Sequence, residues 1–365
     1  MTSDVSDPNE EVLDDPQTYE QALESKESTA WLKTIQEELD SMDKNKVWEL
    51  VELPEGLAVK DQGEKVCRLT KAIYGLKQSP RQWFFTFHKV ITEYGFIPNL
   101  YDPCVYTQVS GGKFVILSLY VDDILLMRND LDIVLRIKEW LKTQFDMKDM
   151  GEDSFILGIK IESDKKIKKL LLSQERYLDN LLKRFGVIGW KTIDFISRFI
   201  NRQVYQRKLT PSSDEKRLKM QSIPYAQVVG SLTYAMLCTR SDLGFVVNLV
   251  SRYQSNPSAL HWQAVKRILR YLLGTKDYKL TYQTDELVPI GYADSNYVGG
   301  PDDRKSTSGF VFTLPDAPIS WGSKKQKCVV KTTMEAEFVS CSLASTKSCV
   351  DQRFLRRLEI ELLGW

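Results

Sequence analysis

Apolar side chains recur at three- and four-residue intervals along several stretches of the chain, which is the spacing of one helix face. Residues 17–46 show this pattern through Trp31, Ile35 and Leu39, and a second helical stretch begins after Pro80. Further helices are expected at about 131–145, at 174–185, over 224–275 in two or three pieces divided at Arg240-Ser241-Asp242 and Asn256-Pro257, and over 332–363 as one long helix or two in succession.

Short apolar or alternating runs predict strands between these helices. They lie at 104–109, 114–127, around 155–161, 288–297, 307–314 and 317–322. Residues 186–222 are irregular and basic, and residues 1–16 have the composition of a flexible acidic tail. Strands mixed with helices in this way predict an α+β fold.

The composition is that of an ordinary globular protein. The chain has 365 residues, enough for two or three domains, with 42% hydrophobic and 27% charged residues. This balance argues against wholesale disorder, collagen-like repeats and coiled-coil rods. Asp122 and Asp123 interrupt the most apolar run, residues 114–127, so no membrane span is expected.

The expected setting is intracellular and reducing. The N-terminus lacks the basic start and apolar core of a signal peptide, so secretion is not expected. Six cysteines are widely scattered without a C-x-x-C pair, and the only histidines are His88 and His261, which argues against a structural zinc site. We interpret His261 as a packing or helix-start residue.

The net charge of +1 hides an asymmetry. The first 30 residues contain nine acids and one base, whereas residues 160–220 contain 16 Lys or Arg and seven Asp or Glu. A basic segment can follow phosphates by charge alone, and it can equally be a solvated helix face with loops. Charge therefore leaves nucleic-acid binding open.

A pair of aspartates, Asp122 and Asp123, stands between two apolar strands. Such a pair is often a solvated turn, but here it is expected at the tip of a hairpin with buried arms. Neighbouring carboxylates repel each other unless cations neutralise them. Two Mg²⁺ ions held by such carboxylates are the apparatus of phosphoryl transfer to a nucleotide.

Four motifs in order resemble the reverse transcriptase of copia-type retrotransposon polyproteins. They are Cys67-Arg68-Leu69 followed by Ile73-Tyr74-Gly75-Leu76-Lys77-Gln78-Ser79-Pro80-Arg81-Gln82-Trp83, then Tyr101-Asp102-Pro103-Cys104-Val105-Tyr106, Tyr120-Val121-Asp122-Asp123 and Phe155-Ile156-Leu157-Gly158-Ile159. The resemblance implies that Asp122 and Asp123 are catalytic Mg²⁺ ligands. It also implies nucleic-acid contacts from Gly75, Lys77, Gln78, Arg81 and Gly158, the last in a strand that grips the primer end. Without the resemblance, Lys77 and Arg81 could be surface cations on a loop.

A second set of carboxylates lies in Gly291-Tyr292-Ala293-Asp294-Ser295-Asn296 and Thr332-Thr333-Met334-Glu335-Ala336-Glu337-Phe338. Taken alone, Asp294 could face solvent from a strand, and an early helical Glu could be a favourable partner for the helix dipole. Together with the strands that follow Asp294, the two segments resemble the start of an RNase H domain. That resemblance implies Asp294 and Glu337, rather than Glu335, as catalytic Mg²⁺ ligands. It places Ser306, Lys324 and Lys325 against nucleic acid.

Both catalytic sets are expected to be incomplete. The family carries a third Asp of the polymerase site on a strand well before Gly75, and no acid between Trp48 and Arg68 lies in a buried-strand pattern. Trp48-Glu49-Leu50-Val51 runs directly into Leu53-Pro54-Glu55-Gly56, where the family has a long block with the fingers. The chain is also expected to end before the next metal-binding Asp of RNase H.

The resemblance divides the chain into four parts. They are the acidic tail (1–16), a partial reverse transcriptase with palm and thumb but without fingers after about residue 54 (17–189), a helical connection (190–285) and an incomplete RNase H-like domain (286–365). The implied partners are RNA, DNA, their hybrid and deoxynucleoside triphosphates, in an element that integrates DNA. Three hypotheses stay open: an inactive polyprotein remnant, a non-catalytic nucleic-acid-binding protein, and an incomplete gene model of an active polyprotein.

Overall fold

The structure is a computed structural model, and it describes most of the chain. The described residues are 18–25, 27–52, 65–73, 75–151, 155–164, 166–196, 213–283, 288–299, 303–315 and 317–363. The predicted acidic tail 1–16 lies outside them. Helices and sheets are mixed, which confirms the α+β prediction. The chain divides into two compact units, residues 1–98 with 103–130 and residues 99–102 with 131–365.

The first unit begins with two helices where the periodicity predicted one. They are α1 (Tyr19–Glu24) and α2 (Ser28–Lys44). Thr18 caps α1 by accepting a hydrogen bond from the backbone N–H of Gln21 (3.2 Å), and the Ser25 hydroxyl donates to the Ala22 carbonyl at its end (2.9 Å). The break escapes a pattern analysis because the apolar spacing continues through it. A two-stranded antiparallel hairpin of β1 (Trp48–Glu52) and β2 (Lys65–Leu69) follows.

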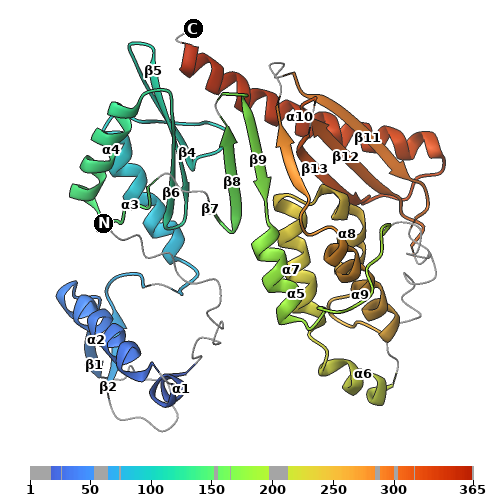
Figure 1. The fold of residues 1–365 in the computed structure, drawn as a ribbon, viewed down its shortest axis with the longest axis horizontal. Coiled ribbons are helices and arrows are strands. Elements are labelled where there is room, and N and C mark those ends of the chain that lie inside the picture. The colour runs from blue at the N-terminus through green and yellow to red at the C-terminus, as the bar shows by residue number, and fades with distance from the viewer. Residues whose placement is uncertain are drawn as a thin grey trace. The chain divides into compact units, whose positions relative to one another are not determined.

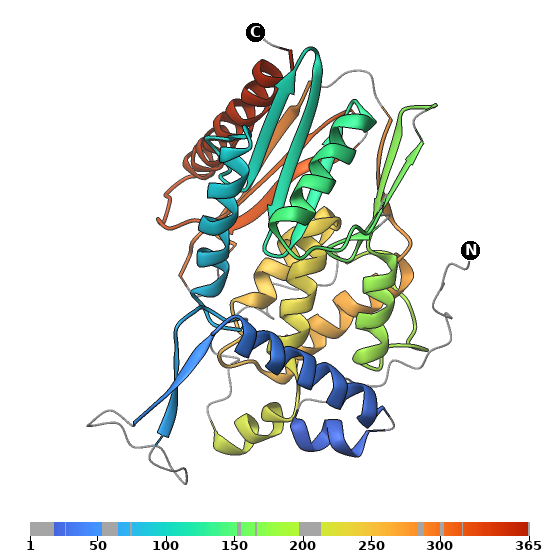
Figure 2. The same cartoon turned by 90° about the vertical axis from the view of Figure 1, so that its left-hand side faces the viewer.

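A four-stranded antiparallel sheet with one covering helix forms the core of the first unit. Its order is β3 (Ile97–Pro98), β4 (Val105–Ser110), β5 (Lys113–Tyr120) and β6 (Asp123–Arg128). Helix α3 (Ser79–Glu93) packs along it (Figure 2). The Phe87 ring of α3 lies edge-on to Tyr106, with the ring centroids 6.1 Å apart. Tyr106 pairs with Leu117 across the strands, so the buried alternate residues of β5 share the face that α3 covers.

The second unit opens with α4 (Leu131–Gln144) and a second antiparallel sheet. The sheet order is β10 (Lys279–Tyr282), β9 (Lys169–Ser173), β8 (Ile159–Asp164) and β7 (Phe155–Ile156). The single strand predicted around 155–161 is therefore wrong. Leu157 (φ 51°) and Gly158 (φ 70°) form a two-residue turn between β7 and β8, since paired left-handed residues match the twist of a tight hairpin.

A helical core follows and confirms the predicted division of 224–275. It contains α5 (Glu175–Arg184), α7 (Tyr225–Cys238), the 3-10 turn η4 (Ser241–Leu243), α8 (Gly244–Ser251) and α9 (Ala259–Gly274), whose buried aliphatic side chains form one cluster. Helix α6 (Asp214–Gln221) corrects the prediction that residues 186–222 are irregular. His261 forms a capping box with Ser258 at the start of α9, which confirms its interpretation as a helix-start residue.

The last layer is an antiparallel meander under a long helix. Strands β11 (Ile290–Asn296), β12 (Thr307–Thr313) and β13 (Pro318–Lys325) pair in that order, and α10 (Thr333–Leu363) runs along β11 and β12 (Figure 1). The prediction left one helix or two open over 332–363, and the structure has one. In the part of the chain that the structure describes, no helix combines the length and apolar character needed to cross a bilayer.

Candidate functional site

The Asp122-Asp123 pair lies at the exposed end of the β5–β6 hairpin. Tyr120 pairs with Asp123, so Val121 and Asp122 form the two-residue turn between the strands. Both carboxylates are exposed, while Val115, Leu117 and Leu119 are buried along the preceding strand. The hairpin tip is as predicted, although β6 is only half-buried. Val121 adopts φ 49°, a left-handed conformation that is unfavourable for a β-branched residue.

A side chain of α3 holds this turn. The indole Nε1–H of Trp83 donates to the Val121 carbonyl oxygen at 2.6 Å. The predicted nucleic-acid contacts Gly75, Lys77, Gln78 and Arg81 stand in and just before the first turn of the same helix, and all four are exposed. Gly75 has φ 90° and open space around the position of a Cβ, which agrees with a turn. The structure thus joins the helix end that bears these cations to the aspartate turn.

Gly158 belongs to the second unit. The hydroxyl of Tyr234 on α7 donates to the Leu157 carbonyl, and a Cβ added at Gly158 would lie 3.9 Å from that hydroxyl oxygen. The turn is therefore anchored to the helical core. Gly158 lies in a hairpin turn and not within a strand as predicted, and its contact with the primer stays a prediction.

Asp294 and Glu337 meet although 43 positions separate them in the sequence. The backbone N–H of Ser295 donates both to Asp294 Oδ1 (2.8 Å) and to Glu337 Oε1 (3.3 Å), so β11 and α10 place the two carboxylates at one amide. Asp294 is exposed and Glu337 half-buried. Glu335 instead accepts from the Lys331 backbone N–H at 2.7 Å, and its own N–H bonds the Thr332 hydroxyl. Glu335 therefore caps α10 and leaves Glu337 as the partner of Asp294.

The three residues predicted to face nucleic acid around this pair, Ser306, Lys324 and Lys325, differ in burial. Ser306 is fully buried and accepts from the Val298 backbone N–H (3.1 Å), so it does not face nucleic acid in this structure. Lys325 is half-buried and pairs with Asp303 at 2.6 Å. Burial alone would raise the pKa of Asp303, but the hydrogen bonds and charges of Lys325 and its neighbours outweigh burial and lower the pKa. Lys324 is exposed.

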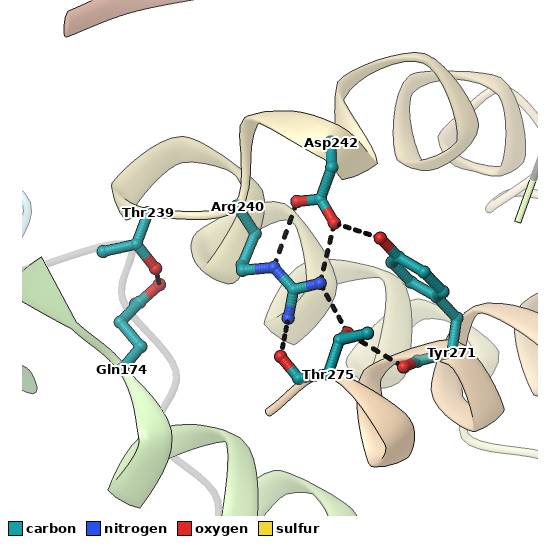
Figure 3. A network of polar contacts seen from close by, with 6 residues as sticks. All are labelled: Gln174, Thr239, Arg240, Asp242, Tyr271 and Thr275. Carbon is teal, nitrogen blue, oxygen red and sulfur yellow. Dashed lines mark hydrogen bonds and ion pairs between the residues drawn. The ribbon is translucent and has the colours of Figure 1, made fainter. Parts of the chain in front are cut away.

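Sequence reasoning missed a buried arginine network below the same sheet (Figure 3). Arg240 is 2% exposed and binds Asp242 through Nε (3.0 Å) and Nη2 (2.7 Å), while Nη1 donates to the Thr275 carbonyl at the end of α9 (2.9 Å). Tyr271 donates its hydroxyl to Asp242 (2.8 Å), and burial followed by this bond raises the pKa of Tyr271 to about 12. The network holds the turn at η4 against the C-terminal end of α9. An arginine at a predicted helix break was its only signal in the sequence.

A pocket of about 780 Å³ lies beside the network. Residues from η4 and α8 form one wall, and residues of β11, β12 and β13, including Asp294 and Trp321, form the other. Asp294 thus borders this pocket and also accepts from the Ser295 N–H that Glu337 shares. Trp321 donates from Nε1 to the Met236 carbonyl (2.9 Å) and fixes this wall to α7.

Comparison with known proteins identifies the family. A family profile described as reverse transcriptase (RNA-dependent DNA polymerase) matches residues 33–195. The retrovirus-related Pol polyprotein from transposon TNT 1-94 of Nicotiana tabacum is 40% identical over 84% of the chain, and that from transposon RE2 of Arabidopsis thaliana is 35% identical over 80%. The chain belongs to the copia-type retrotransposon Pol polyprotein family. Its reverse-transcriptase domain covers the matched residues.

The chain spans 23% and 20% of the lengths of these two polyproteins. It also covers 92% of a shorter relative, the uncharacterized mitochondrial protein AtMg00810 of Arabidopsis thaliana, at 30% identity over 63% of the chain. No solved structure matches the chain.

The carboxylates predicted as metal ligands fall into two pairs, one in each unit. Asp122 and Asp123 are adjacent in the first, and Asp294 and Glu337 meet in the second. Within the described ranges, no three His, Cys, Asp or Glu side chains come together in a way that could hold a metal ion. Mg²⁺ is commonly bound through one or two carboxylates with substrate phosphates completing its shell. Each pair therefore fits one ion shared with a phosphate ligand, and neither supplies the bridging set of a two-metal centre.

Proposed function

We propose that this chain is a reverse-transcriptase and RNase H fragment of a copia-type retrotransposon that has lost DNA synthesis. The Asp122-Asp123 turn carries the proposal. It stands at the end of an antiparallel hairpin, is exposed for contact with a nucleotide, and is tied by Trp83 to the cationic end of α3. In this assignment the β3–β6 sheet with α3 is the polymerase palm, and Lys77, Gln78 and Arg81 bind template or nucleotide phosphates.

The β11–β13 meander under α10 is proposed as the first part of an RNase H-like domain. Convergence of Asp294 and Glu337 on one backbone amide supports this assignment, because the two residues come from a strand and a helix that the resemblance pairs. The pair would hold Mg²⁺ against the RNA strand of an RNA–DNA hybrid. Lys324, which is exposed, would contact the backbone of the hybrid. Residues 190–285 would then be the connection between the two parts, and 17–189 the partial polymerase with its thumb.

We infer the loss of DNA synthesis from the incomplete set of carboxylates at the polymerase site. Ion spacing and alignment of the attacking hydroxyl both depend on the full ligand set, so a missing ligand costs orders of magnitude in rate. In the first unit β1 pairs directly with β2, from Trp48 with Leu69 to Glu52 with Lys65. Across the described residues of that hairpin, no carboxylate joins the Asp122-Asp123 turn to complete a metal site. Bound Mg²⁺ would supply charge neutralisation at phosphate.

Primer extension on the purified full chain tests the proposal. With an RNA template, Mg²⁺ or Mn²⁺ and deoxynucleoside triphosphates, we expect no synthesis above that of the Asp123→Asn variant. Robust extension that Asp123→Asn abolishes would overturn the loss of activity. Asp130→Asn serves as a matched control, because Asp130 is a half-buried carboxylate of the same unit that pairs with Lys113 at 2.7 Å, outside the turn.

A non-catalytic role in nucleic-acid binding is the second candidate. Exposed Lys77, Gln78 and Arg81 on one helix end favour it, because cationic contacts to phosphate survive the loss of a metal ligand. Binding of an RNA–DNA hybrid by the full chain should weaken as salt rises, and Lys77→Ala with Arg81→Ala should reduce the salt dependence by about two charges. If Lys77 and Arg81 contact no phosphate, the double variant should bind the hybrid as the wild type does. Such a protein would act inside the cell, where RNA and DNA are its partners.

A further inference from the structure

The amide of Gln326 lies beneath the Asp294–Glu337 pair. Gln326 directly follows β13 and is 5% exposed. Its Nε2 lies 2.9 Å from the Ala336 carbonyl oxygen, 3.0 Å from the Ser308 hydroxyl and 3.4 Å from the Ser295 hydroxyl. Ala336 precedes Glu337, and Ser295 follows Asp294. One carboxamide therefore contacts the α10 backbone next to Glu337 and the serine side chain next to Asp294.

The orientation of this amide is dictated by its neighbours. A carbonyl oxygen only accepts hydrogen bonds, so the NH₂ group and not the oxygen of Gln326 must face Ala336. The oxygen, Oε1, is buried and has no hydrogen-bond partner among the residues that the structure describes. A buried acceptor without a hydrogen bond costs free energy of folding. Gln326 keeps this orientation because its NH₂ group can then bond both α10 and the sheet.

Ser340 forms a second brace on the same two elements. Its side chain is fully buried, and the hydroxyl lies 2.6 Å from the Asp294 carbonyl oxygen and 3.2 Å from the Gly309 carbonyl oxygen. Ser340 stands one helical turn after Ala336, so both contacts lie on the face of α10 that meets the sheet. The brace acts on the backbone of Asp294 itself.

We propose that Gln326 is a positioning residue that fixes the spacing between the Asp294 and Glu337 carboxylates, with Ser340 as its auxiliary. The proposal rests on the proposed metal-binding function of this pair. Without the amide, α10 and β11 keep their apolar contacts, but Glu337 loses its register against the Ser295 N–H. Side chains that orient metal ligands typically alter metal affinity by 10- to 100-fold when replaced.

The test compares Gln326→Met with Gln174→Met in the full chain. Methionine keeps the length and volume of glutamine without its donors. Gln174 is a matched control because it is 1% exposed, accepts from the Thr239 hydroxyl (2.7 Å) and has its own buried unpartnered amide atom within the described part of the chain. Ser340→Ala and Ser340→Thr form a second pair, in which threonine restores the hydroxyl.

Two readouts separate positioning from metal binding. Hydrogen exchange of the Ser295 N–H reports the spacing of the carboxylates without any metal, and we expect it to accelerate at least about 10-fold in Gln326→Met but not in Gln174→Met. Broadening of the same amide signal by Mn²⁺, competed by Mg²⁺ and removed by Asp294→Asn, reports binding, and we expect about 10-fold weaker affinity in Gln326→Met.

The outcomes are distinct. Faster Ser295 exchange in Gln326→Met alone supports positioning, even if Mn²⁺ broadens no signal in the wild-type chain, which would overturn the metal-binding function. Unchanged Ser295 exchange in Gln326→Met overturns positioning, even if the wild-type chain binds Mn²⁺. Equal acceleration in both glutamine variants overturns it as well, because the effect would then be general destabilisation.

Discussion

The indole N–H of Trp83 donates a hydrogen bond to the carbonyl oxygen of Val121 at 2.6 Å. This contact joins Trp83, in the second turn of α3, to the residue that precedes the Asp122-Asp123 pair. Val121 is held at φ 49°, where a β-branched side chain is strained. A contact from outside the hairpin therefore stabilises the conformation of the aspartate turn. The contacting residue lies 38 positions earlier in the chain.

Replacing Trp83 by Phe should loosen the aspartate turn. Phenylalanine can keep the aromatic contact that Trp83 makes with Phe87 (ring centroids 5.9 Å) but donates no hydrogen bond. We expect a loss of about 1 kcal/mol in local stability, since the Val121 carbonyl becomes free to bond water. Hydrogen exchange measured by mass spectrometry over residues 117–127 should accelerate. The same change at Trp140 in α4 is the control, and equal exchange in both variants would show that Trp83 does not hold the turn.

Replacing Val121 by Asn should stabilise the same turn. Asn tolerates the left-handed conformation far better than a β-branched residue, and Val121 is already 41% exposed, so little apolar burial is lost. We expect the free energy of unfolding of the first unit to rise by about 1 kcal/mol in urea titrations. Val109→Asn is the matched control. It alters an equally exposed valine (37%) inside β4, where Asn is unfavourable and stability should fall.

Replacing Arg240 by Met should destabilise the second unit severely. The guanidinium is buried between Asp242 and the C-terminal end of α9, so its loss leaves the Thr275 carbonyl without this donor and Asp242 without its cationic partner, with the Tyr271 hydroxyl still bonded. We expect a cost of about 3 kcal/mol in urea unfolding followed by tryptophan fluorescence. Arg270→Met on α9 is the control, since Arg270 is half-buried and donates to the Lys191 carbonyl. Similar midpoints for the two variants would contradict a special role of Arg240.

Local patterns predicted most helices of this chain but not its long-range pairings. The helical pieces within 224–275 followed from apolar periodicity, and His261, interpreted as a packing or helix-start residue, lies in the capping box of α9. Strand β10 pairs with β9 more than 100 positions away, and Leu170 to Ser173 read as a short apolar run that fits a helix or a strand equally well. No local signal specifies such a partner.

The candidate sites divide in the same way. Asp122, Asp123, Asp294 and Glu337 were found because the motifs are contiguous or resemble a family, and the structure brings the last two together. Gln326, Ser340 and Arg240 were missed, because a polar residue gives no sign in the sequence that it will be buried. The resemblance placed Ser306 against nucleic acid, whereas the structure buries its side chain, and the hydroxyl accepts from the Val298 N–H.

Ionisation of Tyr106 should make the first unit sensitive to alkaline pH. Burial, followed by the nearby Cys104, raises the pKa of Tyr106 from 10.0 to about 12, and its hydroxyl lies 3.1 Å from His88 Nδ1. The folded state thus favours the neutral phenol. Its contribution to stability is complete below pH 10, the pKa in the unfolded chain, and is lost as the pH rises through about 12.

Urea unfolding of the first unit between pH 9 and 12 measures this effect on the wild type and on Tyr106→Phe. The wild type should lose up to about 1.4 kcal/mol per pH unit more than the variant across that interval. Tyr120→Phe is the control, because Tyr120 is 57% exposed in the same sheet and should leave the wild-type slope unchanged. Parallel slopes for the wild type and Tyr106→Phe would mean that the buried phenol does not govern the alkaline transition. The difference in tyrosinate absorbance between the wild type and Tyr106→Phe on the same samples reports the ionisation of Tyr106.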